Sequence, residues 1–233
     1  MERATKRIST LTETKKQKRV RIITTIGIVM GMLLLFVLGL IYFKGFDYVK
    51  DNFLGHPTKE LVEGEWVFSE YGNPGVKIET PKVLKRMDVS NAIPKEAKAM
   101  IKSMNMFAYG SMIDDFYITV TTTKFTKAIQ SDLDKAVEGS LKTLEGRGAQ
   151  NVIVKTEEFD TQKGISGKKA YGTFSFVDKA SQTSQKIYYE MLVFGQEDGL
   201  QQIILMHREG DKYGEQLFER ILNSVELQTP GQP

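Results

Sequence analysis

The stretch KKAYGTFSFVDKASQTSQKIYYEMLVFGQEDGLQQIILMHR, residues 168–208, decides the fold. Its three runs rich in β-branched and aromatic residues predict strands over 168–177, 185–195 and 200–208. The segments between these runs are short and polar, and the Asp-Gly of QEDG (196–199) is a strong hairpin signal. Because consecutive strands with short connections pair antiparallel, this stretch predicts an antiparallel sheet.

Further strands are expected on both sides of this stretch, over 65–70, 76–80, 106–112, 116–125 and 151–159. Apolar residues at helical spacing predict three helices, over 94–104, 131–147 and 211–227. We expect the second helix to pack on the sheet through one apolar face, made of Leu133, Val137, Leu141 and Leu144. The order β-β-α-β-β-α-β-β-β-β-α makes the fold class α+β, an antiparallel sheet flanked by helices.

An uncharged apolar run, IITTIGIVMGMLLLFVLGLIYF, occupies residues 22–43. A helix of this length is about 33 Å long, which is enough to cross the hydrocarbon core of a bilayer. The run is longer than the apolar region of a cleaved signal peptide, and no small-x-small cleavage site follows it, so an uncleaved signal-anchor is favoured over cleavage. The sequence therefore predicts a single transmembrane helix.

The charges around this run predict its orientation. Residues 1–21 carry eight Lys/Arg and two Asp/Glu, whereas the basic and acidic residues of 44–51 balance. Since positive flanks stay in the cytoplasm, we expect a single-pass protein of the plasma (inner) membrane with a cytoplasmic N-terminus and an extracytoplasmic C-terminal domain.

These features divide the chain into five parts. We expect a basic cytoplasmic tail (1–21), a transmembrane helix (22–43), a stalk or linker (44–64), an α+β domain (65–228) and a disordered tail (229–233). From Asp51 onward the chain has 22 Lys/Arg and 26 Asp/Glu, a net charge of −4. The net positive charge of the whole chain therefore comes from the N-terminal tail, residues 1–21. This distribution gives no reason to expect nucleic-acid binding by the folded part.

The α+β part resembles the PsbP-like fold family. The resemblance rests on five pieces of sequence: WVFSEYGNPGVKIETP (66–81), FYITVTTTKF (116–125), the helix that ends at Gly148, GKKAYGTFSF (167–176) with IYYEMLVF (187–194), and FERILNSVEL (218–227). It implies a non-enzymatic module that docks on larger assemblies or holds small ligands in the cell envelope. The chain differs from that family in its membrane helix and in having no recognisable transit peptide.

No catalytic constellation is evident in the sequence. The chain has no cysteine, which excludes disulfides, thiol catalysis and Cys–zinc sites. His56 and His207 are the only histidines, and we expect surface or packing roles for both, because a metal site needs further ligands at a recognisable spacing. Asp114-Asp115 is expected to form a turn. We therefore predict no catalytic residue, metal or cofactor.

Two surfaces for association stand out. Gly27 and Gly31 form a GxxxG pair in the predicted membrane helix, where small residues allow close helix–helix contact, so a homo-oligomer is one expectation. A basic, methionine-bearing patch is expected on the 94–104 helix, where it would face the membrane or a partner, and it comprises Lys95, Lys98, Met100, Lys102 and Met104. The interpretation that the sequence favours is that its methionines pack on the sheet while its lysines are solvated, because an amphipathic helix of a globular domain usually buries its apolar face.

Taken together, these features predict a membrane-anchored, non-enzymatic binding or accessory module for a protein complex of the cell envelope. An alternative is a sensor or carrier domain that takes a lipid or another small ligand between the sheet and the methionine-bearing helix. A third hypothesis, an envelope hydrolase, would require two polar side chains that converge in a cleft.

Overall fold

The computed structural model describes residues 56–89, 99–112, 114–127, 132–177, 184–196 and 198–228, together with Met32, Leu35, Leu38, Gly39 and Tyr42. The chain divides into two compact units, Met1–His56 and Pro57–Pro233. In the first unit Met32, Leu35, Leu38, Gly39 and Tyr42 are helical, and His56 is not. None of the helices within the described ranges is long and apolar enough to cross a membrane. The tails 1–21 and 229–233, and all but those five residues of the predicted span 22–43, lie outside the described residues.

The second unit contains helices and strands in an α+β arrangement. Its described helices are α3 (Pro57–Glu63), α5 (Leu133–Gly146) and α6 (Lys212–Asn223). Its described strands are β1 (Val67–Tyr71), β2 (Val76–Thr80), β3 (Lys85–Met87), β4 (Ile101–Tyr109), β5 (Phe116–Phe125), β6 (Gln150–Asp160), β7 (Ser166–Val177), β8 (Ser184–Gln196), β9 (Gly199–Arg208) and β10 (Glu226–Leu227).

Seven of these strands form one antiparallel sheet in the order β3-β4-β5-β9-β8-β7-β6. The ladder between β5 and β9 runs from Phe116 opposite His207 to Lys124 opposite Gly199, and it joins parts of the chain that are far apart in sequence. A smaller antiparallel sheet has the order β1-β2-β10. The predicted antiparallel pairing of the 168–208 stretch is confirmed by the β7–β8 and β8–β9 ladders.

The helix predicted over 94–104 is wrong where the structure describes it. Residues 99 and 100 form a turn, and Ile101–Tyr109 is strand β4, paired along its length with β5. The aromatic and β-branched strand β5 offers a full ladder of backbone partners, and this pairing overrides the helical spacing of the apolar residues. The residues from 90 to 98 lie outside the described ranges.

Helix α3 lies within the segment expected to be a linker. Thr58, on α3, is fully buried, and its hydroxyl donates a 2.8 Å hydrogen bond to the Asp211 carboxylate at the start of α6. The same carboxylate accepts from the Tyr213 backbone N–H at 3.0 Å, so it caps α6 while it anchors α3. The last part of the expected linker therefore packs on the domain, and residues 44–55 lie outside the described ranges.

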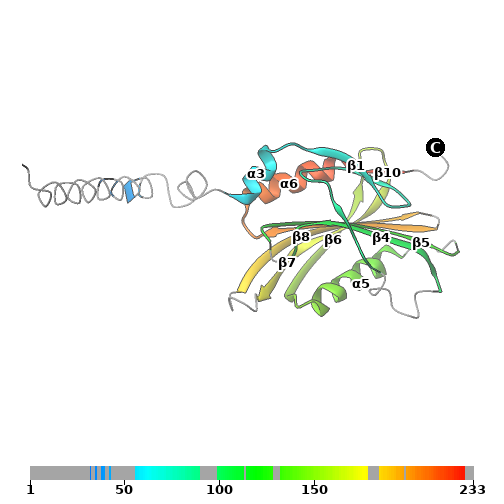
Figure 1. Ribbon diagram of the computed structural model, residues 1–233. Coiled ribbons are helices and arrows are strands. Elements are labelled where there is room, and N and C mark those ends of the chain that lie inside the picture. The colour runs from blue at the N-terminus through cyan, green and yellow to red at the C-terminus, as the bar shows by residue number, and fades with distance from the viewer. Residues whose placement is uncertain are drawn as a thin grey trace, which may run out of the picture. The chain divides into compact units, whose positions relative to one another are not determined.

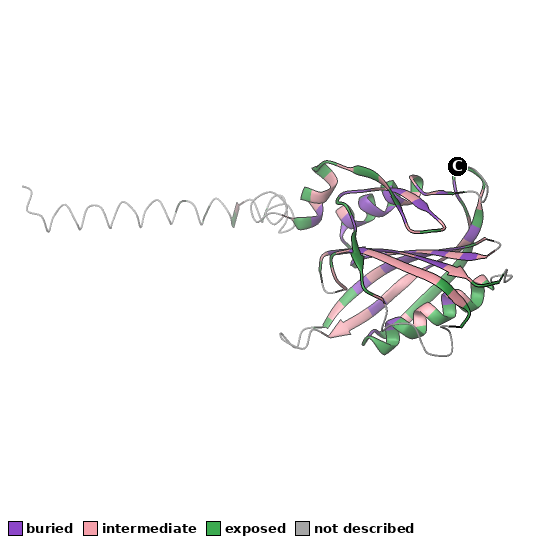
Figure 2. Ribbon diagram, turned by 45° about the vertical axis from the view of Figure 1, so that its right-hand side comes forward, coloured by how far each residue is buried: buried purple, intermediate pink, exposed green. Residues whose placement is uncertain are grey.

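The large sheet buries an apolar layer on each face. Figure 1 shows α3, α6 and the small sheet on one face and α5 on the other, and Figure 2 shows the buried residues concentrated between these layers. Strand β5 contributes side chains to both layers, because successive side chains of a strand point to opposite faces of the sheet. Ile118 and Val120 face the α6 side, and Tyr117 faces the α5 side. The expected packing of the 131–147 helix on the sheet is confirmed, with Val137 and Leu144 of α5 buried.

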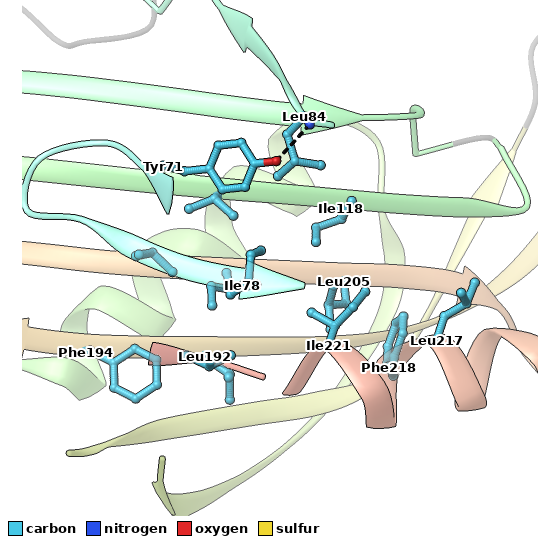
Figure 3. Close-up of a cluster of buried hydrophobic side chains, with 14 of the residues drawn as sticks. Tyr71, Ile78, Leu84, Ile118, Leu192, Phe194, Leu205, Leu217, Phe218 and Ile221 are labelled. Atoms are coloured by element: carbon cyan, nitrogen blue, oxygen red, sulfur yellow. Dashed lines mark hydrogen bonds between the residues drawn. The ribbon is translucent and has the colours of Figure 1, made fainter. Parts of the chain in front are cut away.

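The layer under α6 is the larger of the two. Figure 3 shows Leu217, Phe218 and Ile221 of α6 beside side chains of the sheet. It also shows the Tyr71 hydroxyl, which accepts a 3.1 Å hydrogen bond from the Leu84 backbone N–H and so links β1 to the segment before β3. Aromatic contacts extend this layer to His207, whose ring centroid lies 4.6 Å from that of Phe218.

Arg220 connects α6 to the neighbouring elements on this face of the sheet. The Arg220 guanidinium on α6 donates two hydrogen bonds, of 3.0 and 2.6 Å, to the Glu79 carboxylate on β2 and lies 4.0 Å from the Trp66 ring centroid. These hydrogen bonds from Arg220 lower the pKa of Glu79. Trp66 in turn donates to the Val62 carbonyl on α3 at 3.2 Å. Arg220 thereby connects α6 to β2 directly and to α3 through Trp66.

Two helical glycines allow a matched test of this packing. A Cβ added at Gly214 of α6 would lie 2.5 Å from His207 Cγ and 2.7 Å from its Cβ, whereas a Cβ at Gly139 of α5 would meet nothing within 4 Å. We expect Gly214→Ala to lower the free energy of unfolding by about 1–3 kcal/mol through overpacking. Gly139→Ala should raise it by about 0.4–1 kcal/mol through helix propensity. Urea denaturation measures both, and equal effects of the two substitutions would contradict this packing.

Candidate binding cleft

A cleft of about 620 Å³ opens where α3, the β4–β5 hairpin and the end of β9 meet. Helix α3 contributes Pro57, Thr58, Glu60 and Leu61 to its wall. The other side is formed by the hairpin and strand ends, through Tyr109, Gly110, Asp114, Asp115, Phe116 and Arg208, with Lys82 beside them. The volume lies within the usual range of small-molecule sites, about 300–1,000 Å³.

The β4–β5 hairpin holds two acidic side chains at the cleft. The predicted Asp114-Asp115 turn is confirmed: the Ser111 backbone N–H donates to the Asp114 carboxylate at 2.7 Å, and the Asp114 N–H donates to the Ser111 carbonyl at 3.0 Å. Gly110 enters this turn with φ +75°, and a Cβ there would lie 2.3 Å from the Phe116 carbonyl oxygen. The close approach and the positive φ together require glycine at this position.

The β5–β9 ladder places a basic side chain opposite these acids. Because Phe116 pairs with His207, the residues just beyond them, Asp115 and Arg208, meet where the β5–β9 ladder ends. Arg208 Nε lies 2.6 Å from Asp115 Oδ1, and both side chains keep part of their surface in solvent. The guanidinium is therefore positioned by a carboxylate while its remaining N–H groups can still bind an acceptor.

The two remaining charges of the cleft, Glu60 and Lys82, are exposed and form no ion pair with the residues that the structure describes. Apolar contact area comes from Leu61 and Tyr109, which are half-buried. Phe116 also lines the cleft but is only 3% exposed, and its ring centroid lies 6.3 Å from that of Phe218. The cleft thus combines charges of both signs with an aromatic wall. This lining fits a polar, charged ligand or peptide segment better than an acyl chain, because buried hydrocarbon does not satisfy charged groups.

A second polar cluster lies on the α6 side of β7 and β8. Lys169 Nζ is 3.2 Å from Glu190 Oε2 and 3.5 Å from Glu157 Oε1, and the Tyr188 hydroxyl donates to Glu190 Oε1 at 2.9 Å. Burial, reinforced by the Glu190 charge, raises the pKa of Tyr188, so this phenol stays protonated and serves as a donor. Lys169 offsets part of the charge of the two carboxylates, and the cluster offers no activated nucleophile, so we assign it to stability.

His207 is a core histidine. It is 1% exposed, its Nδ1 lies 2.7 Å from the Arg208 carbonyl oxygen, and its ring packs against Phe218 and Tyr188. Burial lowers its pKa, against the opposing influence of that carbonyl and of Asp211, Glu215 and Glu190. The expected packing role is confirmed. Within the described ranges no group of three His, Asp or Glu side chains is placed to hold a metal ion.

The residues of the basic, methionine-bearing patch do not share a helix. Lys95 and Lys98, like Gly27 and Gly31, lie outside the described residues. Met100 is 54% exposed in the turn before β4, Lys102 is exposed in β4, and Met104 is half-buried in the same strand. Met106, two residues on from Met104, pairs with Met87 of β3, so these methionines line the edge of the sheet. Their role in binding stays a prediction.

Sequence reasoning did not identify the cleft. Asp114 and Asp115 were expected only as a turn, and no local motif marks Glu60, Lys82 or Arg208. The Asp115–Arg208 pair follows from the β5–β9 register, which a single sequence does not specify. The only usable signal was Arg208, a charge placed directly at the end of a predicted strand.

Comparisons with known proteins give no family. No family model and no curated protein matches the sequence. Among solved structures, LpqN of Mycobacterium tuberculosis, described as involved in cell envelope biogenesis, is 13% identical with a TM-score of 0.40, over 74% of this chain and 97% of that chain. A Bacteroides thetaiotaomicron protein is 13% identical with a TM-score of 0.38, over 72% of this chain and half of that one. Both TM-scores are below 0.5, and the resemblance to the PsbP-like fold is not confirmed.

The lowered pKa of His207 predicts a pH dependence of stability. Below about pH 6.5 the unfolded chain binds a proton at His207 that the folded chain resists, so the free energy of unfolding should fall as the pH drops below that value. His207→Leu should remove the part of this decrease in the free energy of unfolding that comes from His207. Urea denaturation at several pH values between 7.5 and 5 measures it. His56→Gln, which removes the other histidine, should keep it. An unchanged pH slope in His207→Leu would contradict the assignment.

Proposed function

We propose that this chain is a single-pass membrane protein that presents a non-enzymatic binding domain outside the cytoplasm, as an accessory module for a protein complex of the cell envelope. The cleft beside α3 is its contact site. The observation that carries the proposal is the Arg208–Asp115 pair in a cleft that also exposes Glu60 and Lys82. Such a surface recognises a partner segment that carries both charge and an apolar side chain.

The membrane part of the proposal rests on the sequence. The uncharged run 22–43 is long enough to span a bilayer, and the eight Lys/Arg of residues 1–21 favour a cytoplasmic N-terminus. Thirteen residues, 44–56, separate this run from the first residue of α3. A chain of that length reaches at most about 45 Å when fully extended, so the domain and its cleft would work close to the membrane surface.

The non-enzymatic part of the proposal is supported by the character of the cleft. Its side chains are an arginine and a lysine, three carboxylates, a threonine, apolar groups and a tyrosine, and both histidines of the chain lie outside its lining. Thr58 already donates its hydroxyl hydrogen to Asp211. Two polar side chains, Asp115 and Arg208, do converge in this cleft, as the hydrolase hypothesis requires. A nucleophile with an adjacent general base, the arrangement that acyl-transfer hydrolases use, is missing from this lining.

A second candidate function is supported by the volume of the cleft. A site of about 620 Å³ is the size that holds a small molecule, so the domain would act as a sensor or carrier of a polar small ligand. The charged lining disfavours a lipid tail in this cleft. The expected location of such a ligand, between the sheet and a methionine-bearing helix, is replaced by the cleft because residues 101–109 form β4.

The absence of cysteine allows one experiment to test sidedness and partner together. Val83 is 58% exposed and adjoins Lys82 without lining the cleft. In spheroplasts of cells expressing Val83→Cys, a membrane-impermeant maleimide that carries a photoreactive group should label the protein and, on illumination, capture one protein that mass spectrometry identifies. Thr5→Cys in the tail should stay unlabelled. Glu138→Cys on α5 should be labelled but capture nothing.

The cleft itself is tested by adding Arg208→Glu to Val83→Cys, which should abolish capture while labelling continues. If nothing is captured, native mass spectrometry of the purified full chain decides the second candidate, which requires a bound small molecule that Arg208→Glu loses. Labelling of Thr5→Cys but not of Val83→Cys would contradict the orientation. If the cleft captures no protein and the full chain carries no small molecule whose binding depends on Arg208, the proposed role of the cleft is contradicted. Turnover of an envelope substrate by the full chain would contradict the non-enzymatic assignment.

A further inference from the structure

Strand β6 leaves one edge of the large sheet open. It lies at the end of the strand order and pairs with β7 alone among the described strands. Its other edge therefore presents a row of backbone N–H and C=O groups without strand partners, a template for pairing with another chain. At the opposite end of the sheet the edge strand β3 is only three residues long, whereas β6 has eleven.

The exposed side chains of β6 include apolar ones. Ile153 is 58% exposed and Val154 is 41% exposed, although each belongs to a strand of the main sheet. The ladder with β7 is irregular between Gln150 and Ile153 and continuous from Ile153 to Asp160. The regularly paired part of β6 thus has eight residues. It begins with Ile153 and Val154, two apolar side chains that no described residue buries.

The charges of β6 are complementary to those of a second β6 in one register. When two copies pair antiparallel about a two-fold axis through Thr156, Lys155 of each strand lies opposite Glu157 of the partner subunit, on the same face of the sheet. The same register places Ile153 opposite Phe159 of the partner subunit. Lys155 forms no ion pair with the described residues, and the Glu157 side chain is 49% exposed beside Lys169, so both are accessible for this contact.

Other two-fold registers are less favourable. An axis at Lys155, Glu157 or Glu158 places two identical charges directly opposite each other. An axis at Val154 extends the pairing into the irregular part of the strand near Gln150 and forms no pair of opposite charges. Charge and regularity together select the axis at Thr156.

We propose that this protein forms a homodimer in which β6 pairs antiparallel with β6 of a second copy, centred on Thr156. The seven-stranded sheets of the two copies then form one continuous sheet. The occupant of the edge is a second copy because the pattern of lysine, threonine and glutamate at 155–157 is self-complementary.

Thr156→Cys tests the dimer directly in a chain that has no other cysteine. Directly opposed residues of an antiparallel pair have Cα atoms about 4.5–5.5 Å apart, within the range that a disulfide bridges. Mild oxidation of the full-length variant in native membranes should give a disulfide-linked dimer. Glu145→Cys, exposed on α5, should not. A Thr156→Cys yield no higher than that of Glu145→Cys, or a crosslink to a different protein, would overturn the proposal.

Charge reversal tests the register. In the Thr156→Cys background, Lys155→Glu creates two like-charge pairs and should lower the yield of dimer about fivefold or more. Lys155→Glu combined with Glu157→Lys exchanges both charges and should restore it. Gly27→Leu with Gly31→Leu, which blocks close contact of the predicted membrane helices, should leave the crosslink in place. Insensitivity to Lys155→Glu, no recovery in the exchanged pair, or loss of the crosslink in the glycine variant would overturn the β6 contact.

Discussion

The antiparallel ladder between β5 and β9 is the constraint on which the rest of the domain depends. It joins the β3-β4-β5 part of the sheet, made from the chain before α5, to the β9-β8-β7-β6 part, made from the chain after it. Its side chains supply both apolar layers: Ile118 and Leu205 are fully buried under α6, and Met206 is buried on the α5 side. Two halves that each form by local hairpins thus become one sheet only through a pairing of high sequence separation, which carries a large loop-closure cost.

The same ladder creates the cleft. The ladder ends at the pair Phe116 and His207, and the next residues, Asp115 and Arg208, meet as an ion pair just beyond it. Helix α3 closes the other side because the buried Thr58–Asp211 hydrogen bond ties it to the start of α6. The cleft is therefore lined by a helix, a hairpin and a strand end of the domain, and a change in the β5–β9 register would separate Asp115 from Arg208.

Local patterns predicted much of this domain. The strands of 168–208, the strand over 116–125 and the helices near 131–147 and 211–227 were accessible because alternation, turn residues and helical spacing act within a few residues. The segment predicted as a helix over 94–104 is the exception. Met104 lies four residues after Met100, a helical spacing, but pairing of this segment with β5 determines its conformation. The sequence of the segment alone does not contain that partner.

The cleft was less predictable than the fold for the same reason. Glu60, Lys82 and Arg208 are ordinary surface charges in the sequence, and only the three-dimensional arrangement brings them to one cavity. Thr58 is a further case, since nothing local indicates that this hydroxyl reaches Asp211 across most of the chain. Asp114 and Asp115 were correctly expected to form a turn, but the contact of Asp115 with Arg208 at the end of β9 depends on register.

A pair of engineered cysteines measures that register most directly. Thr119 and Ile204 lie opposite each other in the β5–β9 ladder, whereas Gln202 lies opposite Thr121. Thr119→Cys with Ile204→Cys should form an intrachain disulfide on mild oxidation of the full chain, identified by peptide mass spectrometry, and Thr119→Cys with Gln202→Cys should not. A disulfide in the second pair and none in the first would contradict the ladder, and with it both the joined sheet and the cleft.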